Sequence, residues 1–258
     1  MEIRFEGAEA DAHEIEAYSG AVSLEGIARA ATLAAHYAIT EEVRFRAPYS
    51  DELEFRIFAP EPGSLRFPLK AIANVAAAAD KRKLAAALFL ALLARSTGQE
   101  IEPEVSAEIS SLNSGDLDAL AEAAEPGLQR AHRWIDQANK KIVVADGDEE
   151  PIALDAETKE YLRIEATDEV ASQDVTVSAL NANNRTGRVY FEDLKRTIPF
   201  KISRDAENRT LSNLSKYLSR YVDKTNEWVS IKFLPIRFAD GRLKRIVIFD
   251  CALASELE

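Results

Sequence analysis

The sequence predicts an α+β protein in which a small N-terminal sheet covered by alanine-rich helices is followed by a C-terminal β-barrel. Three observations lead to this prediction. Short runs of alternating apolar and polar residues near the N-terminus indicate half-buried strands. Alanine- and leucine-rich stretches in the middle of the chain are typical of buried helices. The last third of the chain reads as three β-rich runs, one helix and two more β-rich runs.

Residues 1–140 are expected to form the first domain. A strand at residues 3–7 is followed by a long helix from about residue 17, whose apolar residues recur at helical spacing. Gly20 and Gly26 lie in this helix, and glycines let a neighbouring backbone approach, so we expect the helix to lie flat on a sheet. Alternation and turn signals predict further strands of that sheet at residues 42–47, 52–59 and 65–68.

Helices are expected to fill the rest of this domain. The sequence predicts them at residues 69–79 and 84–95, with three shorter helices between residues 100 and 139, separated at 113–116 and 125–127. The helix at 84–95 is apolar nearly all round, which is typical of a buried helix. It packs in the domain's core, or against another chain, or, as a third alternative, on a membrane. Its candidate interface residues are Leu84, Leu88, Phe89, Leu92 and Leu93.

Residues 141–171 are expected to link the two domains. A hairpin is predicted from strands at 141–145 and 151–154. Asp155 is a good N-cap for a short helix through Tyr161. The hairpin and the helix could belong to either neighbouring domain, and the polar run 166–173 is the expected boundary.

Residues 172–258 are expected to form the second domain. A helix marked by Leu211, Leu214, Leu218 and Tyr221 lies between the third and fourth β-rich runs. This order resembles the OB-fold, a five-stranded barrel with its helix between the third and fourth strands. The β-rich runs lie at residues 174–181, 188–192, 197–203, 227–236 and 242–250.

Charge divides the chain in the same place. The whole chain carries 32 Lys and Arg against 44 Asp and Glu. Residues 172–258 hold 15 basic and 11 acidic residues, whereas residues 1–171 hold 17 basic and 33 acidic residues. An acidic body joined to a mildly basic module indicates two domains with different partners. The alternative is that the acidic helices simply keep the body soluble.

Few of the known catalytic or cofactor-binding patterns fit this sequence. Its single cysteine, Cys251, lies at the end of a predicted strand and is expected to be a small buried residue. The three histidines lack metal-ligand spacing, and neither a phosphate-binding glycine loop nor a serine-nucleophile elbow is present. We therefore expect no cofactor, no metal and no enzymatic activity.

The sequence predicts a cytoplasmic protein with no membrane partner. The N-terminus lacks a basic start followed by an apolar stretch, so it does not look like a signal peptide. The longest apolar run spans eleven residues, from Leu84 to Ala94. A helix that crosses a bilayer needs about 20.

The predicted barrel carries a candidate surface for single-stranded nucleic acid. Such surfaces combine cations that follow the phosphates with aromatic rings on which bases stack. The same mixture would also occur on any small barrel with a wet exterior, and the acidic body would repel phosphates. The candidate residues are Arg185, Arg188, Tyr190, Lys201, Trp228 and Lys232.

Five short stretches of the chain carry a resemblance when they are taken together, at residues 6–13, 23–27, 62–64, 184–189 and 240–246. They are similar to uncharacterised bacterial proteins carried by prophages, mobile elements and anti-phage defence islands. The resemblance covers most of the chain and carries no catalytic residue. It implies an accessory component of a phage-conflict system.

Two functions follow from these patterns. The first is a non-enzymatic interaction or assembly protein that pairs with itself, as a homo-oligomer, or with an effector protein through its apolar helices. The alternative is an accessory protein that binds single-stranded nucleic acid through the barrel.

Overall fold

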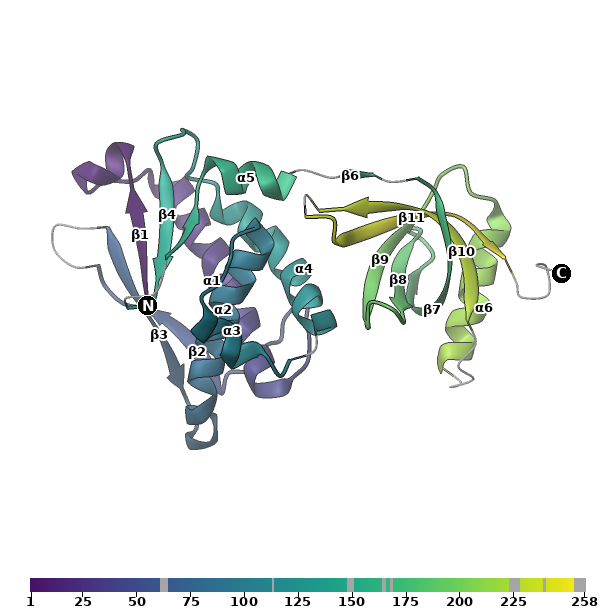
Figure 1. Cartoon of the computed structure of the whole chain (residues 1–258), viewed down its shortest axis with the longest axis horizontal. Helices are drawn as coiled ribbons and strands as arrows, with labels where there is room; N and C mark the ends of the chain where they lie inside the picture. Colours follow the sequence, from purple (N-terminus) through teal and green to yellow (C-terminus); the bar gives the residue numbers. More distant parts are fainter. Residues whose placement is uncertain are drawn as a thin grey trace. The chain divides into compact units, whose positions relative to one another are not determined.

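The computed structural model describes residues 1–60, 65–112, 114–147, 151–163, 166–167, 169–222, 228–238 and 240–252. The chain forms two compact units, Met1–Arg163 and Ile164–Glu258 (Figure 1). Each unit has its own hydrophobic core. The predicted α+β class, with an N-terminal sheet and helices before a C-terminal five-stranded barrel, is confirmed.

A five-stranded antiparallel sheet forms one layer of the first unit. Its strand order is β2-β3-β1-β4-β5. On β1 the side chains of Ile3 and Phe5 are buried while those between them are partly exposed, so one face of the sheet carries the core. The strands are β1 (Glu2–Glu6), β2 (Leu53–Ile57), β3 (Arg66–Ala73), β4 (Lys141–Ala145) and β5 (Ile152–Leu154).

Helices form the second layer of the first unit and gather on one side of the sheet (Figure 1). α2 is buried along most of its length, as its apolar sequence predicts. It packs against α1, α3 and α4. The helices are α1 (Ala17–Thr40), α2 (Arg82–Thr97), α3 (Pro103–Ile109), α4 (Ser114–Ala131) and α5 (Ala156–Arg163), with short 3-10 helices η1 (Ala8–Ala12) and η2 (Ala76–Lys81).

Gly26 of α1 permits a close approach, but to another helix rather than to the sheet. A Cβ atom at Gly26 would lie 2.3 Å from the carbonyl oxygen of Gly127 and 2.4 Å from the backbone nitrogen of Ala131, both on α4. The break expected at residues 125–127 is wrong, because α4 continues through Pro126. Close packing against α1 offsets the roughly 3 kcal/mol that a proline costs inside a helix.

Two further predictions between α1 and α2 are wrong. Residues 42–47 form a loop instead of a strand, although they alternate in polarity. The backbone N–H of Ser50 donates to Nδ1 of the buried His36 (2.9 Å) and ties the end of this loop to α1. Residues 69–73, expected to begin a helix, extend β3 because they pair along the whole of β2. This ladder outweighs the helix propensity of alanine.

The predicted hairpin at residues 141–154 is present and belongs to the first unit. β4 pairs with β1 on one side and with β5 on the other, so the segment completes the sheet instead of linking two domains. The expected cap of α5 is also present, because the backbone N–H of Thr158 donates to Oδ1 of Asp155 (2.9 Å). The remaining part of the expected linker, around residues 166–171, contributes to the second unit.

The second unit is a closed barrel with the OB-type order. β7, β8 and β9 form an antiparallel meander, β9 pairs in parallel with β11, β11 pairs with β10, and β10 returns to β7. Helix α6 lies between the third and fourth barrel strands in sequence, as predicted. The elements are β6 (Ala166–Thr167), β7 (Ala171–Asn181), β8 (Thr186–Phe191), β9 (Arg196–Ile202), α6 (Asn208–Val222), β10 (Val229–Arg237) and β11 (Leu243–Ala252).

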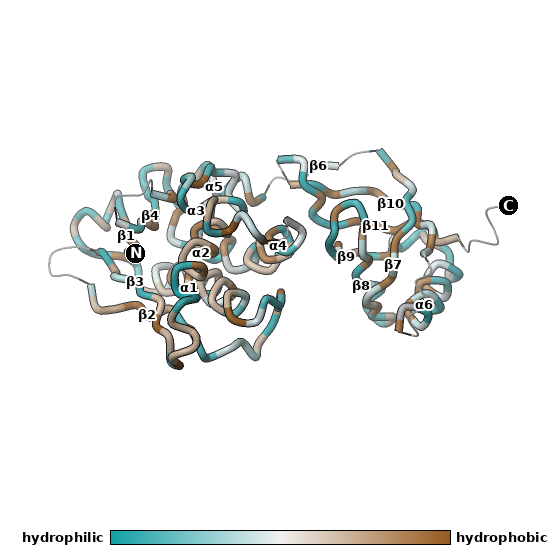
Figure 2. The backbone as a smooth tube through the Cα atoms, turned by 60° about the horizontal axis from the view of Figure 1, so that its bottom comes forward, coloured by the Kyte–Doolittle hydropathy of each residue, from teal (hydrophilic) through white to brown (hydrophobic). Residues whose placement is uncertain are grey.

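The barrel interior follows the alternation of the sequence, which Figure 2 shows as hydrophobic and hydrophilic colours exchanging along the strands. Leu214 and Tyr217 of α6 are buried against this interior, and Cys251 is buried as expected. One detail of the alternation is wrong. A bulge between Val177 and Ala179 shifts the register of β7, so Ala179 turns outward and Leu180 packs towards the core.

No helix within the described part of the chain is both long enough and apolar enough to cross a membrane.

Candidate nucleic-acid interface

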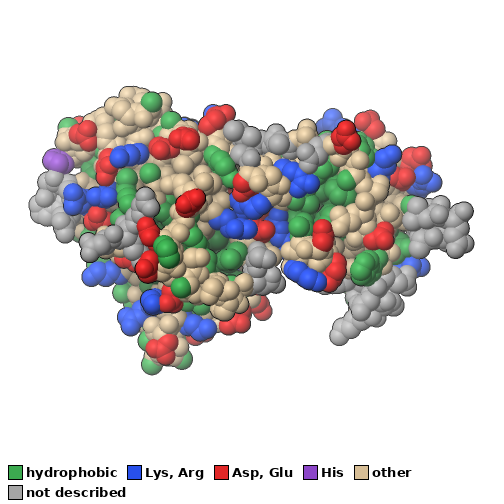
Figure 3. Space-filling view, viewed as in Figure 1, with side chains coloured by type: hydrophobic (Ala, Val, Ile, Leu, Met, Phe, Trp, Pro, Cys, Tyr) green, Lys and Arg blue, Asp and Glu red, His purple; other side chains and the backbone are tan. Residues whose placement is uncertain are grey.

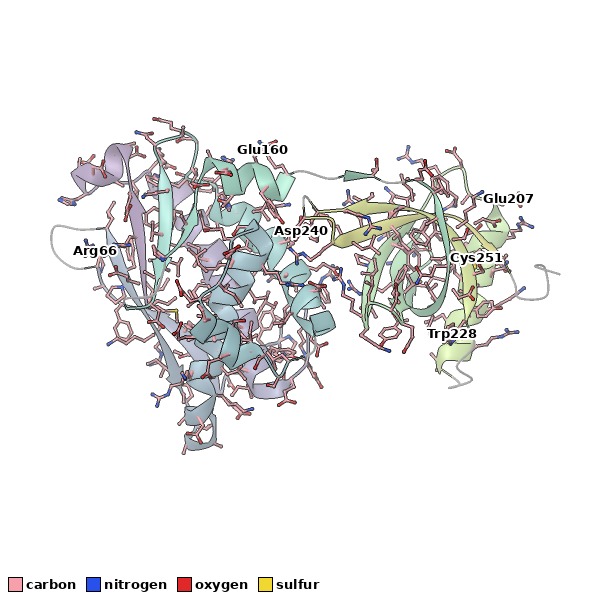
Figure 4. All side chains as sticks on the ribbon, in the orientation of Figure 1. Arg66, Glu160, Glu207, Trp228, Asp240 and Cys251 are labelled. Carbon is pink, nitrogen blue, oxygen red and sulfur yellow. The ribbon has the colours of Figure 1, made fainter. Side chains whose placement is uncertain are left out.

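The six sequence-predicted residues all lie on the barrel, but not on one surface. Arg188 and Tyr190 belong to β8, Lys201 to β9 and Lys232 to β10. The other two are Arg185, in the turn between β7 and β8, and Trp228, directly before β10. Their side chains are drawn with the whole unit in Figure 4, where Trp228 lies near the end of α6.

The outer face of β8 and β9 brings three of the six together. Tyr190 pairs with Thr197, Arg188 with Pro199, and Thr186 with Lys201. Val189 and Ile198, which lie between these positions, are fully buried, so Arg188, Tyr190 and Lys201 point to the outside of the barrel. The predicted sharing of a face by Arg188 and Tyr190 is confirmed.

Hydrogen bonds hold the guanidinium group of Arg188 flat on this face. Its Nε donates to Oγ1 of Thr197 (3.1 Å), and one terminal nitrogen donates to the carbonyl oxygen of Thr197 (3.1 Å). These two bonds fix the orientation of the side chain on the outer face. An arginine fixed in this way loses little side-chain entropy when a ligand binds.

Tyr190 lies in an outward row with Trp228. Thr176 of β7 pairs with Tyr190, and the preceding residue, Val175, pairs with Val229 of β10. Val175 and Val229 are buried, so Thr176 and Trp228, one position away on each strand, are directed outward. Neighbouring strands lie about 4.8 Å apart, which places the backbones of Tyr190 and Trp228 about 10 Å apart on either side of Thr176.

Lys232 lies outside this group. Its neighbours across the sheet are Ser172 on β7 and Asp250 on β11. It is four residues along β10 from Trp228, or about 13 Å. Both residues fall in the predicted strand at residues 227–236, at positions of the same parity, but only Trp228 adjoins the Tyr190 face.

Arg185 is used inside the fold rather than as a free loop cation. One of its terminal nitrogens donates to the carbonyl oxygens of Ser203 (3.0 Å) and Ala206 (3.3 Å), directly before α6. Its backbone carbonyl accepts from the N–H of Ile202 (2.8 Å). We therefore assign Arg185 to holding the β7–β8 turn against the end of β9.

Sequence reasoning missed the residues between the predicted ones. Thr176 lies between the two aromatic residues in the outward row, and Thr197 accepts the hydrogen bond that orients Arg188. Thr197 lies on β9, and Thr176 lies on β7 before the bulge, so in both cases the alternation of the sequence already indicated that the side chain points outward. What the sequence does not contain is the barrel closure, which sets β10 beside β7 and so brings Trp228 near Tyr190.

The charge around this face is mixed. Figure 3 shows Lys and Arg side chains at several places on the visible side of the second unit, with Asp and Glu between them. Lys195, on the turn after β8, is bonded to Glu192, and this bond raises the pKa of Lys195. Lys201 is exposed, and no ion pair joins it to another described residue. We therefore expect phosphate contacts from a few cations rather than from a continuous basic stripe.

The predicted interface on α2 is not a surface. Leu88, Phe89, Leu92 and Leu93 are 0–1% exposed and belong to the core of the first unit, and Leu84 is partly buried against that core. The alternative that the sequence left open, packing in the domain's own core, is therefore correct. The physical reason is that α2 lies between the sheet and three other helices.

The two buried histidines are structural. His36 accepts from the Ser50 N–H and lies edge-to-face with Tyr49, at 5.7 Å between ring centroids. His132 is 1% exposed; its Nδ1 lies 2.7 Å from the Leu128 carbonyl oxygen and its Nε2 lies 2.9 Å from Oγ1 of Thr158. Burial lowers the pKa of both imidazoles. Among the residues that the structure describes, no three His, Cys, Asp or Glu side chains are grouped to hold a metal ion.

The first unit contains a pocket of about 460 Å³ beside β5. Its floor is apolar, from Leu90, Val105 and Ile152, and two glutamates, Glu100 and Glu102, also line it. The remaining lining residues are Gln99, Ile101, Pro103 and Pro151, so the two glutamates are the charged side chains among the described residues of this pocket.

Two family models match the sequence. One, described as a domain of unknown function (DUF7946), matches residues 1–163, and the other, described as a family of unknown function (DUF7947), matches residues 169–252. No curated protein and no solved structure matches the chain. The two matches divide the chain where the two compact units divide.

Proposed function

The chain belongs to the DUF7946 family, and we propose that its C-terminal barrel binds single-stranded nucleic acid across the outer face of β7, β8 and β9. The observation that carries this proposal is the outward row of Tyr190, Thr176 and Trp228, with Arg188 held flat beside it. Aromatic rings beside cations on a closed barrel suit a chain of stacked bases joined by phosphates.

In this mode of binding the two aromatic rings stack on bases and the cations meet phosphates. A separation of about 10 Å between the backbones of Tyr190 and Trp228 equals about three steps of a stacked strand, so it leaves room for at most about two nucleotides between the two stacked bases. Lys201 lies two register positions along β8–β9 from Arg188 and extends the cationic edge of the face. Recognition of this kind depends little on base identity, because every base has a π-face.

The balance of charge predicts moderate affinity. The barrel region holds 15 basic and 11 acidic residues, and the rest of the chain is strongly acidic. Phosphate contacts weaken as salt rises. We therefore expect binding at low ionic strength that decreases steeply towards physiological salt.

The proposal is tested with the full chain and fluorescein-labelled oligonucleotides of deoxythymidine and uridine, followed by fluorescence anisotropy at about 50 mM salt. Tyr190→Ala and Trp228→Ala should each weaken binding by about 5- to 150-fold, the range given by 1–3 kcal/mol per stacked base. Lys201→Ala should weaken binding more than Lys232→Ala, because Lys232 lies away from the face. Absence of binding by the intact protein, or equal binding by all four variants, would contradict the proposal.

The first function expected from the sequence was assembly through α2. Its apolar side chains are buried in the core of the first unit, so they offer no surface for a partner. The place in a phage-conflict system stays a prediction that rests on the sequence resemblance. It predicts that bacteria carrying the gene restrict the plating of some phages, and that the Tyr190→Ala, Trp228→Ala double variant loses this effect. Equal plating with and without the gene across a broad phage panel would count against it.

A further inference from the structure

The sheet of the first unit has two edge strands, β5 and β2, which differ in whether their outward backbone groups are hydrogen-bonded within the chain. At β5, the side-chain amide of Gln99 closes the edge: its Oε1 accepts from the N–H of Ala153 (3.1 Å), and its Nε2 donates to the carbonyl of Ala153 (2.9 Å). These are the two bonds that a residue of a neighbouring antiparallel strand would make. The edge at β5 is therefore satisfied within the chain.

At β2, none of the hydrogen bonds among the described residues covers the second half of the edge in this way. The N–H of Phe58 donates to Pro68 and the carbonyl of Glu52 accepts from Asn74, so both even-numbered positions bond towards β3. The register is unbroken between them. Because hydrogen-bonding directions alternate along a strand, Phe55, Ile57 and the following Ala59 direct their N–H and C=O groups to the free edge.

Each face of this open edge presents one exposed apolar side chain, and Glu54 and Arg56 share the face of Phe58. Ile57 and Phe58 are consecutive residues with opposite side-chain directions, and they are 40% and 43% exposed. Natural sheets normally protect such an edge with charges, a bulge or a covering segment, because it can pair with another strand. Leu53, at the other end of β2, is 1% exposed, so the accessible edge begins after it.

We propose that β2 pairs in an antiparallel manner with β2 of a second copy of this chain, about a two-fold axis at Ile57. A second copy is favoured because the open segment is complementary to itself. This axis pairs Ile57 with Ile57 of the second copy, and Phe55 with Ala59 of the second copy. The backbone N–H and C=O groups of all these residues point to the free edge and can therefore bond across it. On the opposite face, Arg56 meets the ring of Phe58 of the second copy, a cation–π contact.

Neighbouring registers are less favourable. An axis at Arg56 would set two arginines directly opposite each other, and like charges at that position are destabilising. An axis at Phe55 would set Glu54 opposite Arg56, but it would also require the backbone of Leu53, which is buried. The axis at Ile57 avoids both conflicts. The ring of Phe58 already receives one cation within the chain, because Nζ of Lys70 lies 5.3 Å from its centroid.

A pairing this short covers less than the roughly 1,200 Å² of a typical stable interface, so the dimer is weak and depends on concentration. We expect a dissociation constant on the order of 10–100 µM. This inference concerns the first unit and holds whether or not the barrel binds nucleic acid.

A cross-linking experiment on the full chain tests the pairing. Residues opposite each other in a hydrogen-bonded pair have Cα atoms about 5.5 Å apart, which is within disulfide range. Ile57→Cys should therefore form a covalent dimer on mild oxidation. Val75→Cys is the matched control, because Val75 is 42% exposed but lies outside the edge. The native Cys251 is 1% exposed and adds little background. No more dimer from Ile57→Cys than from Val75→Cys would overturn the proposal.

Sedimentation equilibrium gives the second readout. The average mass of the wild-type protein should rise as its concentration increases from about 5 to about 500 µM. Ile57→Pro removes an N–H that points to the free edge and spares the bonds to β3, so it should stay monomeric with an unchanged circular dichroism spectrum. A wild-type protein that stays monomeric throughout, or an Ile57→Pro variant that associates like the wild type, would overturn the pairing.

Discussion

His132 shows how a residue that resembles a catalytic or metal-binding group serves the fold. It joins the end of α4 to α5 through the Leu128 carbonyl and the hydroxyl of Thr158. Thr158 in turn is capped by Asp155. Charged neighbours act on the ring from both directions, because Lys159 lowers and Asp155 raises its pKa, but burial has the largest effect and lowers it.

This environment predicts a loss of stability in mild acid. In the folded protein the pKa of His132 lies below its ordinary value of 6.5, so the unfolded chain binds the proton more readily. The contribution of His132 to the free energy of unfolding should not change with pH above about 6.5, and it should decrease as the pH drops below that value. The slope from one histidine is at most about 1.4 kcal/mol per pH unit. His36, whose pKa is lowered in the same direction, adds to the effect.

Urea unfolding at several pH values between about 7.5 and 5.5 checks this prediction. His132→Gln keeps a polar side chain without a titrating ring, so its stability should depend less on pH than that of the wild type. If both proteins lose stability at the same rate over this range, His132 does not carry the pH dependence.

The burial and the bonding partners of individual charged residues could not be predicted from the sequence. Arg185 and Arg196 both lie between predicted strands, where the sequence favours exposed loop cations. Arg185 is bonded to backbone carbonyls before α6, and Arg196 is 5% exposed with one terminal nitrogen donating to the Leu243 carbonyl. Lys140 is buried in the first unit against Glu9 (2.7 Å), Asp136 (2.9 Å) and the ring of Trp134. The composition gives the number of charged residues, but it does not show which of them form hydrogen bonds and ion pairs inside the protein and so cannot bind a ligand.

At the scale of elements, tertiary contacts determined the secondary structure wherever the local sequence pattern predicted it wrongly. Residues 69–73 have helix-forming alanine and lysine, yet they extend β3 because β2 lies beside them. Residues 42–47 alternate like a strand but have no strand to pair with and stay in a loop. Pro126 and Gly127 look like a helix break, but α4 runs through them because it packs on α1. Each of these outcomes depends on a partner that is distant in sequence.

The contact between α1 and α4 makes a specific prediction. Gly26→Ala should destabilise the first unit by about 3 kcal/mol or more, because its Cβ would meet backbone atoms of α4 that cannot move separately. Gly20→Ala is the matched control on the same helix. Its Cβ would meet only the flexible end of Ile15, at 2.6 Å, and alanine gains about 1 kcal/mol of helix propensity.

Thermal and urea unfolding of the two variants measure the difference. The control should remain close to the wild type. Equal stabilities for Gly26→Ala and Gly20→Ala would show that the close approach of α1 and α4 does not limit packing.

At the scale of the whole molecule, the sequence predicted the division into two units and the order of the barrel. Both follow from strong local signals, namely the alternation that is clearest in β9 and the helix between the third and fourth barrel strands. The hairpin of β4 and β5 was also predicted, but its membership in the first unit was left open. That choice depends on the pairing of β4 with β1, which lie over a hundred residues apart in the chain.

The candidate surfaces were predicted less completely than the fold. The sequence identified the β8 face correctly because Arg188 and Tyr190 alternate with buried residues. It could not show that Trp228 joins them while Lys232 does not, since that depends on how the barrel closes. The open edge of β2 was not predicted at all, because its neighbours in the sheet come from separate parts of the chain.

The chain's two tryptophans allow a direct test of nucleic-acid binding by the barrel. Trp134 is 1% exposed in the first unit, whereas Trp228 is 52% exposed on the barrel. Stacking of a base on Trp228 should therefore quench the tryptophan fluorescence of the full chain as an unlabelled oligonucleotide is added at low salt. Binding across the outer face of the barrel should give saturable quenching that is absent from Trp228→Phe and reversed by added salt. Unchanged fluorescence, or equal quenching in Trp228→Phe, would contradict it.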